Sequence, residues 1–240
     1  MKELLKQLLN LLHISVTRNQ KYDAYTRKII SRSLKPGSNC IDIGCHKGEI
    51  LDLMILGAEK GTKIGFEPIP GLFQFLKEKY TADTLVKIFP VALYDQAGTT
   101  TFQHVLNAPA YSGIKKRKYD GKHVQIDQIT VETNLLDHFI PEDMQIDLIK
   151  IDVEGAEFNV MKGGIETLKR CKPVVIFEFG LGAADFYNSG PKELHAFLTR
   201  SCGMKISTLK GFLDYAPALT EVQFSNLFEK GEEYYFVAHA

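Results

Sequence analysis

The chain has 240 residues, 45% of them hydrophobic, with 29 basic and 29 acidic side chains. This length suits one globular domain with a large core. A formal net charge of zero excludes an overall field that would attract nucleic acid or an anionic membrane, so we expect no nucleic-acid partner. The four cysteines lack C-x-x-C spacing, which argues against zinc and predicts a reducing, cytoplasmic compartment. They are Cys40, Cys45, Cys171 and Cys202.

The N-terminal stretch 1–14, MKELLKQLLNLLHI, predicts an amphipathic helix. Charged and amide side chains interrupt its leucines, so it lacks the apolar core of a signal peptide and the length of a membrane span. Helical spacing continues over residues 21–35 and stops at Pro-Gly-Ser. We therefore expect residues 1–35 to form an N-terminal helical extension. It would pack on the domain or, as alternatives, form a homodimer contact or lie on a membrane surface.

From residue 36 onward, strand-like and helix-like segments alternate, which predicts an α/β fold with a mostly parallel sheet and helices on both faces. Strands are expected at residues 40–44, 63–68, 85–95, 146–153, 173–180, 204–209 and 233–240. Helices are expected at residues 49–61, 71–80, 155–170 and 191–201. No linker or repeat divides this part of the chain, so we expect one domain over residues 36–240.

Residues 98–133 break the alternation. Two stretches in this segment alternate as strands do, and we expect a small antiparallel insertion around a loop at residues 106–122. The loop contains the basic sequence KKRKYDGK at residues 115–122. That sequence predicts either a solvated loop or a lid that favours an anionic acceptor. Tyr111 and Tyr119 flank its start and could stack on a sugar ring.

The first predicted strand runs into IDIGCHKGE, which places Asp42, Gly44 and Gly48 in a strand-to-helix turn. A dinucleotide site requires G-x-G-x-x-G there. The second and third glycine positions hold His46 and Glu49, which excludes that site, and the P-loop pattern is absent as well. We expect Gly44 and Gly48 to let the backbone pass close under a ligand and to offer free N–H groups.

Glu67 ends the second predicted strand, where an acid can accept hydrogen bonds from both ribose hydroxyls. A nucleoside joined to an amino acid fits this pair of features, and S-adenosylmethionine is such a molecule. The alternative for each residue is structural: a plain turn for the glycines, a helix cap for Asp42 and a surface acid for Glu67.

These motifs resemble a known family. IDIGCHKGE and GFEPIP are similar to the first two motifs of class I methyltransferases, and IKIDVEGAEFNVMKGG followed by VVIFEFG resembles the FkbM-type methyltransferases. The resemblance runs from about Ser38 to Phe179 and departs at Cys45 and His46, where the family more often has Ala-Asn. It implies a Rossmann-like seven-stranded sheet with an antiparallel last strand. It also implies a transferase that methylates hydroxyls of sugars, polyketides or glycans and releases S-adenosylhomocysteine.

The candidate cofactor-binding residues follow the carboxyl ends of the first four strands of the predicted parallel sheet, with adenine expected between apolar walls near Ala92. They are Asp42, Gly44, Cys45, His46, Gly48, Glu49, Glu67, Pro68, Ala92 and Asp152. The candidate catalytic residues are Asp152, Glu154 and Glu178, which end or follow the fourth and fifth of those strands.

Methyl transfer to a hydroxyl needs alignment of oxygen, methyl and sulfur and a base that removes one proton. Asp152 is the main candidate for that base. His46, His104 and His123 are weaker ones. Strand alternation would place Lys150, Asp152 and Glu154 on one side. Together with Glu157, the candidate acids could also ligate Mg²⁺, although spacing gives that no support, and we commit to no metal ligand.

The sequence thus predicts an S-adenosylmethionine-dependent O-methyltransferase acting on a small molecule or glycan. Two alternatives stay open. One is a methyltransferase with a nitrogen, carbon or RNA acceptor, which neutral charge and the lack of an Asn-Pro-Pro-Tyr-like motif disfavour. The other is a cofactor-binding module that works through protein partners, which the presence of Asp42, Glu67 and Asp152 disfavours.

Overall fold

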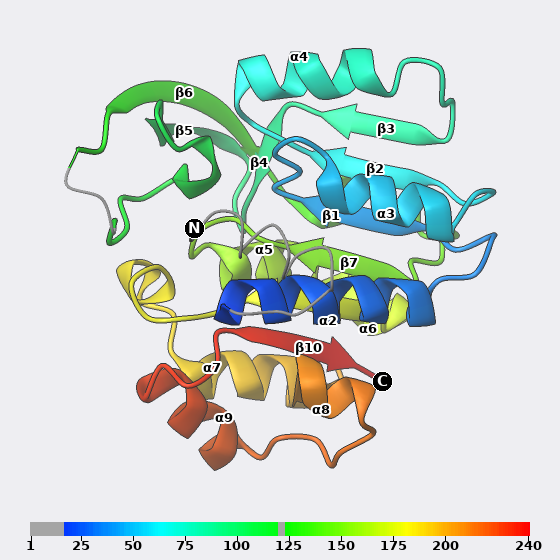
Figure 1. The fold of residues 1–240 in the computed structure, drawn as a ribbon, viewed down its shortest axis with the longest axis vertical. Helices are drawn as coiled ribbons and strands as arrows, with labels where there is room; N and C mark the ends of the chain where they lie inside the picture. Colours follow the sequence, from blue (N-terminus) through cyan, green and yellow to red (C-terminus); the bar gives the residue numbers. More distant parts are fainter. Residues whose placement is uncertain (1–16, 120–122) are drawn as a thin grey trace, which may run out of the picture.

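The computed structural model describes residues 17–119 and 123–240, and seven of the strands there form one sheet (Figure 1). Their order is β3 (Val86–Phe89), β2 (Lys63–Phe66), β1 (Cys40–Ile43), β7 (Leu148–Ile151), β8 (Val174–Glu178), β10 (Tyr235–His239) and β9 (Lys205–Thr208). β3, β2, β1, β7 and β8 pair in parallel, and β10 runs antiparallel to both β8 and β9. The predicted sheet with an antiparallel last strand is confirmed.

A second, three-stranded sheet stands beside the carboxyl ends of the parallel strands (Figure 1). Its order is β4 (Val91–Leu93), β6 (Ile126–Asn134) and β5 (Gly98–Val105). β5 pairs antiparallel with β6, which confirms the predicted insertion. The single extended run expected at residues 85–95 is instead two strands in two sheets. They divide at Pro90, which has no N–H to donate to either ladder.

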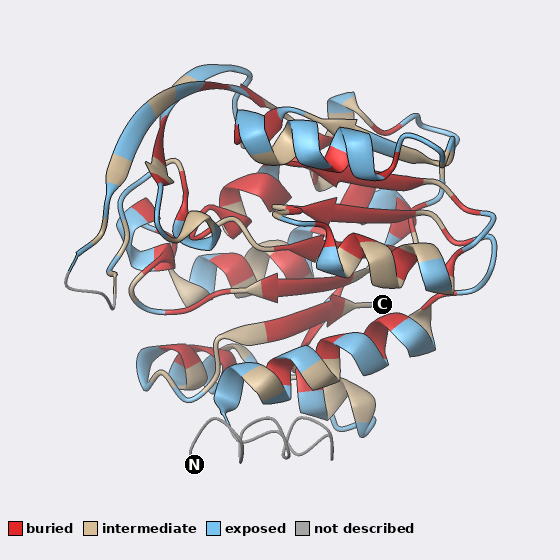
Figure 2. Ribbon diagram, turned by 45° about the horizontal axis from the view of Figure 1, so that its top comes forward, coloured by how far each residue is buried: buried red, intermediate tan, exposed pale blue. Residues whose placement is uncertain are grey.

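Helices cover both faces of the large sheet (Figure 2). One face carries α2 (Arg18–Ser33), α3 (Glu49–Gly57), α4 (Pro70–Lys79) and α8 (Leu209–Leu213). The other carries α5 (Glu157–Gly163), α6 (Ile165–Cys171), α7 (Pro191–Ala196) and α9 (Glu221–Glu229). Short turns η1 (Pro109–Tyr111), η2 (Leu136–His138), η3 (Ala184–Tyr187) and η4 (Phe197–Ser201) complete the connections.

The helix expected at residues 155–170 is two helices, because the chain bends at Gly163 and Gly164. A Cβ on Gly163 would lie 2.1 Å from the backbone oxygen of Tyr94, and one on Gly164 would lie 2.7 Å from a methyl carbon of Leu136. The backbone of Tyr94 therefore requires glycine at position 163, whereas a side chain at position 164 would require Leu136 to shift. The break at Gly164 begins α6 with a new first turn and leaves α5 only 7 residues long.

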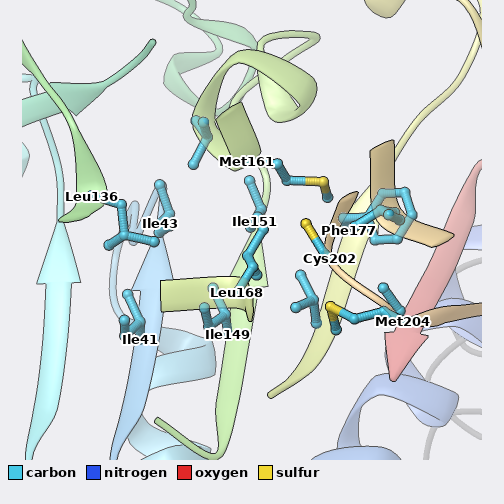
Figure 3. Packing of buried hydrophobic residues seen from close by; sticks show 14 of the residues in the cluster. Ile41, Ile43, Leu136, Ile149, Ile151, Met161, Leu168, Phe177, Cys202 and Met204 are labelled. Carbon is cyan, nitrogen blue, oxygen red and sulfur yellow. The ribbon is translucent and has the colours of Figure 1, made fainter. Parts of the chain in front are cut away.

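Strand alternation decides which side chains reach the core and which reach the site. Ile41, Ile43, Ile149 and Ile151 point to the α5–α6 face, where they pack with Met161 (Figure 3). Burial of such aliphatic side chains is the main source of stability for a sheet of this kind.

On the α2–α3 face, the side chains of β1, β7 and β8 change from apolar to polar along each strand. Cys40, Leu148 and Ile176 are apolar and lie in the core cluster of that face. The next residues on that face, two positions along each strand, are Asp42, Lys150 and Glu178. This face is therefore apolar at the amino ends of the strands and polar at their carboxyl ends.

α2 belongs to the extension predicted at residues 1–35, and its Ile29 and Ile30 are buried in the core cluster of the α2–α3 face. The amphipathic stretch predicted at residues 1–14 lies outside the described residues, and the domain boundary at residue 36 stays a prediction. Within the described part of the chain, no helix combines the length and the apolar character needed to cross a bilayer.

Candidate functional site

The turn after β1 is held tightly against β2. Gly44 and Gly48 have φ values of +82° and +78°, which favour glycine. The N–H groups of Gly44 and Cys45 both donate to the carbonyl of Phe66, and the N–H of Gly48 donates to the carbonyl of Cys45. Hydrogen bonds to β2 and within the turn therefore use the N–H groups of both glycines and hold the turn in one conformation. The expectation of free N–H groups elsewhere in the turn stays a prediction.

Gly44 is also the point where β1 and the segment after β7 come closest. A Cβ on Gly44 would lie 2.0 Å from the backbone oxygen of Asp152, a distance that real structures do not allow. The N–H of Asp152 donates to the carbonyl of Ile43 at 3.0 Å. The glycine thus fixes Asp152 beside the turn, at the carboxyl edge of the sheet.

Glu67 follows β2 and is 4% exposed. Its two oxygens accept the N–H groups of His46 and Ile69, each at 2.9 Å. Burial raises the pKa of Glu67 to about 7, although these two amides act in the opposite direction. Because each carboxylate oxygen has a second lone pair, Glu67 can hold the turn and still accept ligand hydroxyls.

Asp42 is 1% exposed, and neither of its carboxylate oxygens has a well-formed hydrogen bond. Burial raises its pKa to about 7, while the charge of Lys150 and the nearby N–H of Leu51 lower it. A buried carboxyl without a partner is costly unless a ligand satisfies it. Asp42 lines a hollow with Gly44 and His46, so a cationic or hydroxyl-bearing ligand there would supply the missing partner.

A second hollow of about 570 Å³ opens over the carboxyl ends of β1 and β2. Glu67 and Pro68 line it, and Val91, Ala92 and Leu93 of β4 form an apolar wall. The roof comes from the predicted insertion and η1, through Phe102, Pro109, Ala110, Ser112 and Ile114. Sequence reasoning missed this roof, because nothing in the insertion indicates which of its residues turn toward the large sheet.

The hollow containing Asp42 adjoins the hollow over Glu67, since Gly44, His46 and Asp152 line both. The two together form one elongated pocket with an apolar end at Ala92 and a polar end at Asp42. That shape fits a molecule with an aromatic base at one end, a ribose over Glu67 and a charged amino acid at the other end. S-adenosylmethionine has this layout, and the unpartnered Asp42 is an independent sign that the fit is good.

Asp152 is held by two neighbours on the α2–α3 face. Lys150 Nζ lies 2.6 Å from Asp152 Oδ2, and the hydroxyl of Tyr235 donates to the same oxygen at 2.6 Å. Burial would raise the pKa of Asp152, but the charge and hydrogen bond of Lys150 outweigh it and keep the pKa below its usual range. The pKa of Lys150 rises against its own burial because Asp152 and Asp42 are near. Both groups are therefore charged at neutral pH.

Sequence reasoning missed Tyr235. It stands at the start of a core-like strand, and its neighbour Phe236 is fully buried. Because β10 is antiparallel, its first residue lies at the carboxyl edge of the parallel strands, paired with Glu178. In the sequence, Tyr235 is only a tyrosine beside an apolar run. That pattern is too common to indicate a functional site.

Glu154 and Glu178 lie beside Asp152, and side-chain oxygens of the three acids are within 4.8 Å of one another. Burial, followed by the negative charge of Asp152, raises the pKa of Glu178 well above its usual range. The raised pKa favours the neutral form of Glu178, and its hydrogen bond to Asp152 lowers the pKa of Asp152. Glu154 forms an ion pair with Arg117 of the basic loop.

This donor set does not fit Mg²⁺. A divalent ion needs ionised and available oxygens, whereas Asp152 is engaged by Lys150, Glu154 is engaged by Arg117, and burial raises the pKa of Glu178. The cluster balances its charge with the chain's own cations. Mg²⁺ is therefore not supported.

The remaining candidate residues either lie farther from Asp152 or stabilise the turns around the site. Cys45 is buried, and its thiol donates to the backbone oxygen of Asp42. Glu49 begins α3 with a side chain that is 75% exposed, and Glu157 is buried, accepting the N–H groups of Val153 and Gly155. His46 lines both hollows, whereas His104 and His123 line neither.

Fold and site together define a class I methyltransferase, a class that uses S-adenosylmethionine as methyl donor. The family model for the methyltransferase FkbM domain matches residues 42–206. The chain belongs to the FkbM methyltransferase family.

The chain is 32% identical over 159 residues to 2-O-methyltransferase NoeI of Sinorhizobium fredii, an alignment that covers 61% of this chain and 65% of that relative. The chain thus spans less than two thirds of the relative's length.

Solved structures with a similar fold include a methyltransferase FkbM from Methylobacillus flagellatus, with 17% identity, a TM-score of 0.44, and coverage of 60% of this chain and 33% of that one. An rRNA methylase from Streptococcus thermophilus has 8% identity, a TM-score of 0.45, and coverage of 89% and 91%.

Proposed function

We propose that the protein is an S-adenosylmethionine-dependent O-methyltransferase whose acceptor is a hydroxyl of a sugar, glycan or related metabolite. The observation that carries the proposal is Asp152, an ionised carboxylate at the polar end of the cofactor pocket. The relative's name, 2-O-methyltransferase, specifies an oxygen acceptor and supports the same reaction type.

Each part of the cofactor would contact a different residue of the pocket. Glu67 would accept hydrogen bonds from the ribose hydroxyls, and Ala92 would lie against the adenine. Asp42 would receive the positively charged end of the methionine portion, with Gly44 as the floor beneath. The bound cofactor supplies a methyl group on a sulfonium, ready for in-line displacement.

Asp152 would orient the acceptor hydroxyl and take its proton. Lys150 and Tyr235 both bind its Oδ2, which leaves Oδ1 to face the acceptor. A carboxylate with a lowered pKa is a weak base, but the hydroxyl proton becomes strongly acidic as the new carbon–oxygen bond forms. Asp152 is therefore basic enough to accept the hydroxyl proton late in the reaction, once the carbon–oxygen bond is forming. Glu178, protonated, would donate a hydrogen bond rather than act as a base.

The first experiment is calorimetric titration of the purified chain with S-adenosylhomocysteine and, separately, with NADH. We expect binding of the first and none of the second. Transfer from radiolabelled S-adenosylmethionine would then be measured on sugars and glycans. Binding of NADH alone would contradict the class, and cofactor binding without transfer to any hydroxyl acceptor would favour a non-catalytic module.

We also propose a cytoplasmic setting, since Cys40, Cys45, Cys171 and Cys202 are all buried and free.

A homodimer through residues 1–14 stays a prediction, and light scattering of the full chain against one lacking those residues would test it. The division into an extension, 1–35, and a methyltransferase domain, 36–240, stays a proposal of the same standing.

A further inference from the structure

A second large cleft lies on the α2–α3 face, beside the cofactor pocket. One wall is α2, which contributes the exposed Asp23 and Arg27 and the buried Tyr22 and Thr26. The opposite wall is the start of α3, with Glu49 at the rim. The cleft has a volume of about 960 Å³, compared with about 570 Å³ for the hollow over Glu67 and Ala92. We refer to it as the α2 cleft.

The floor of the α2 cleft is the reaction centre itself. Lys150, Asp152 and Tyr235 form it, and Asp152 lines the α2 cleft and both hollows of the cofactor pocket. The α2 cleft also shares Glu49, Ile50 and Lys150 with the hollow that contains Asp42, so it adjoins the polar end of the cofactor pocket. In-line transfer requires the acceptor oxygen on the far side of the methyl group from the sulfur, and a ligand in the α2 cleft would have to present its hydroxyl to Asp152 from that side.

Both acidic and basic side chains line the α2 cleft. Asp23, Glu49 and Asp152 are acidic, and Arg27 and Lys150 are basic, which leaves one more negative than positive charge. Asp23 faces this group across the cleft, since burial raises its pKa while the charges of Arg27 and Lys150 lower it. Donors and acceptors that are interspersed in this way suit a ligand rich in hydroxyls, each of which both donates and accepts. An anionic acceptor would meet no net attraction.

The cleft also offers apolar surface. Ile50 and Leu53 of α3 line it, and the ring of Tyr22 lies 5.2 Å, centroid to centroid, from the ring of Tyr235. A pyranose ring has a CH face and a rim of hydroxyls, so it would use both kinds of surface.

We propose that the α2 cleft binds the acceptor as a neutral pyranoside, and that Asp23 and Arg27 of α2 determine which sugar is accepted. This assignment rests on the proposed methyl transfer and deepens it, because it names the acceptor site and its chemical class. It differs from the expectation that the basic loop at residues 115–122 would favour an anionic acceptor, since within that loop Arg117 is paired with Glu154.

The test measures sugar binding directly, apart from turnover. The full chain, saturated with S-adenosylhomocysteine, is titrated with the methyl α-glycosides of glucose, galactose and mannose and followed by saturation-transfer NMR. For the glycoside that binds the wild type, Asp23→Ala and Arg27→Ala should each raise Kd by about tenfold, the size of one lost charged hydrogen bond. Affinity for S-adenosylhomocysteine should stay within about twofold of wild type.

Lys28→Ala is the matched control, since Lys28 is exposed on the same helix but lines a different hollow, with Tyr25 and Asp214. It should leave both affinities unchanged. A loss of S-adenosylhomocysteine affinity in Arg27→Ala would overturn the proposal, because the cleft would then hold the methionine end of the cofactor. Unchanged glycoside affinity in both wall variants, or no binding of any glycoside to the wild type, would overturn it too.

The charge of the acceptor is tested with methyl α-glucuronide beside methyl α-glucoside at low ionic strength. We expect weaker binding of the glucuronide, and tighter binding would overturn the choice of a neutral sugar. Failure of the wild type to bind S-adenosylhomocysteine would instead remove the proposed function. The two failures are therefore distinguishable.

Discussion

At the residue scale, the cofactor pocket depends on buried carboxylates whose charge is not fully balanced. Asp42 and Glu67 are 1% and 4% exposed, and burial raises the pKa of each to about 7. Keeping such groups buried without a ligand costs stability, and a ligand that donates hydrogen bonds to them recovers it. The same residues therefore control both cofactor affinity and its response to pH.

Glu67→Ala should weaken S-adenosylhomocysteine binding by about 1–3 kcal/mol, the effect of removing a buried hydrogen-bonding group. The variant also frees the N–H groups of His46 and Ile69, which lie under the ligand. Calorimetry measures the affinity. Glu67→Gln keeps one acceptor oxygen and should lose less. Wild-type affinity in the alanine variant would remove Glu67 from the ribose contact.

The affinity for S-adenosylhomocysteine should fall as pH drops below about 7. The ligand's ammonium and hydroxyls favour ionised Asp42 and Glu67, and the protonated forms of these acids accumulate below their raised pKa values. Each proton taken up costs about tenfold in affinity per pH unit, and the affinity should level off between about pH 7 and 8. Calorimetry across this range measures it. Glu67→Gln should reduce the slope, and a flat profile for the wild type would contradict both assignments.

The ligand-free protein should show the opposite trend in stability. A carboxyl whose pKa is higher in the folded than in the unfolded chain stabilises the fold at low pH, and that contribution is lost as pH rises through about 7. Asp42→Asn removes one such group and should flatten the dependence between pH 5 and 8, as measured by denaturant unfolding with the wild type as reference.

Asp152→Asn should retain S-adenosylhomocysteine binding and lose most methyl transfer, since an amide cannot accept the acceptor's proton. Loss of 10²-fold or more in kcat is expected, about the size of general-base catalysis. Tyr235→Phe is the matched comparison because it keeps the carboxylate and removes one of the two hydrogen bonds to its Oδ2. Full activity in Asp152→Asn would exclude the base role.

At the scale of the element, the turn between β1 and α3 is specified by steric contact as much as by hydrogen bonding. Gly44 passes Asp152 and Gly48 passes Tyr80, whose hydroxyl would lie 2.3 Å from an added Cβ. The sequence predicted this turn because its glycine spacing reflects that contact. It could not predict how the N–H groups are used, since their partners lie on β2, a separate segment of the chain.

Gly44→Ala should destabilise the fold by more than the 1–2 kcal/mol that a left-handed conformation costs, because the added Cβ also collides with the backbone of Asp152. Cofactor affinity should fall with it. Thermal unfolding and calorimetry measure the two effects. Gly71→Ala in α4, where an added Cβ has open space, should leave both within about 0.5 kcal/mol. A Gly44→Ala protein of normal stability would contradict the close contact.

Most of the strands and helices could be predicted from the sequence, because the spacing of apolar residues and the length of each segment distinguish buried parallel strands from helices. It did not place Tyr235 or the roof residues such as Ala110. The position of Tyr235 depends on β10 entering the sheet antiparallel between β8 and β9, and residue order alone carries no such information. The resemblance to the FkbM family, rather than periodicity, supplied the direction of the last strand.

At the scale of the whole molecule, two sheets and two helical layers meet along one edge, where the carboxyl ends of five parallel strands collect the polar residues (Figure 1). The small sheet covers the cofactor's side of this edge, and α2 forms a wall on the other side. Cofactor and acceptor would thus be enclosed by parts of the chain that are far apart in sequence. The basic and acidic side chains balance over the chain as a whole, so recognition depends on these local surfaces.

The place of β10 in the sheet has a consequence for the order in which the chain folds. β9 has no sheet partner except β10, and β8 has an open edge until β10 arrives. We predict that β10 inserts late, because it must enter between two strands that are otherwise unpaired with each other. Tyr235 would then reach Asp152 only when β10 inserts. During refolding from denaturant, helical circular dichroism should recover before S-adenosylhomocysteine binding and methyl transfer, and simultaneous recovery would contradict this order. In the interval, two unpaired strand edges are exposed, so slow insertion of β10 is the stage at which this protein is most prone to aggregate.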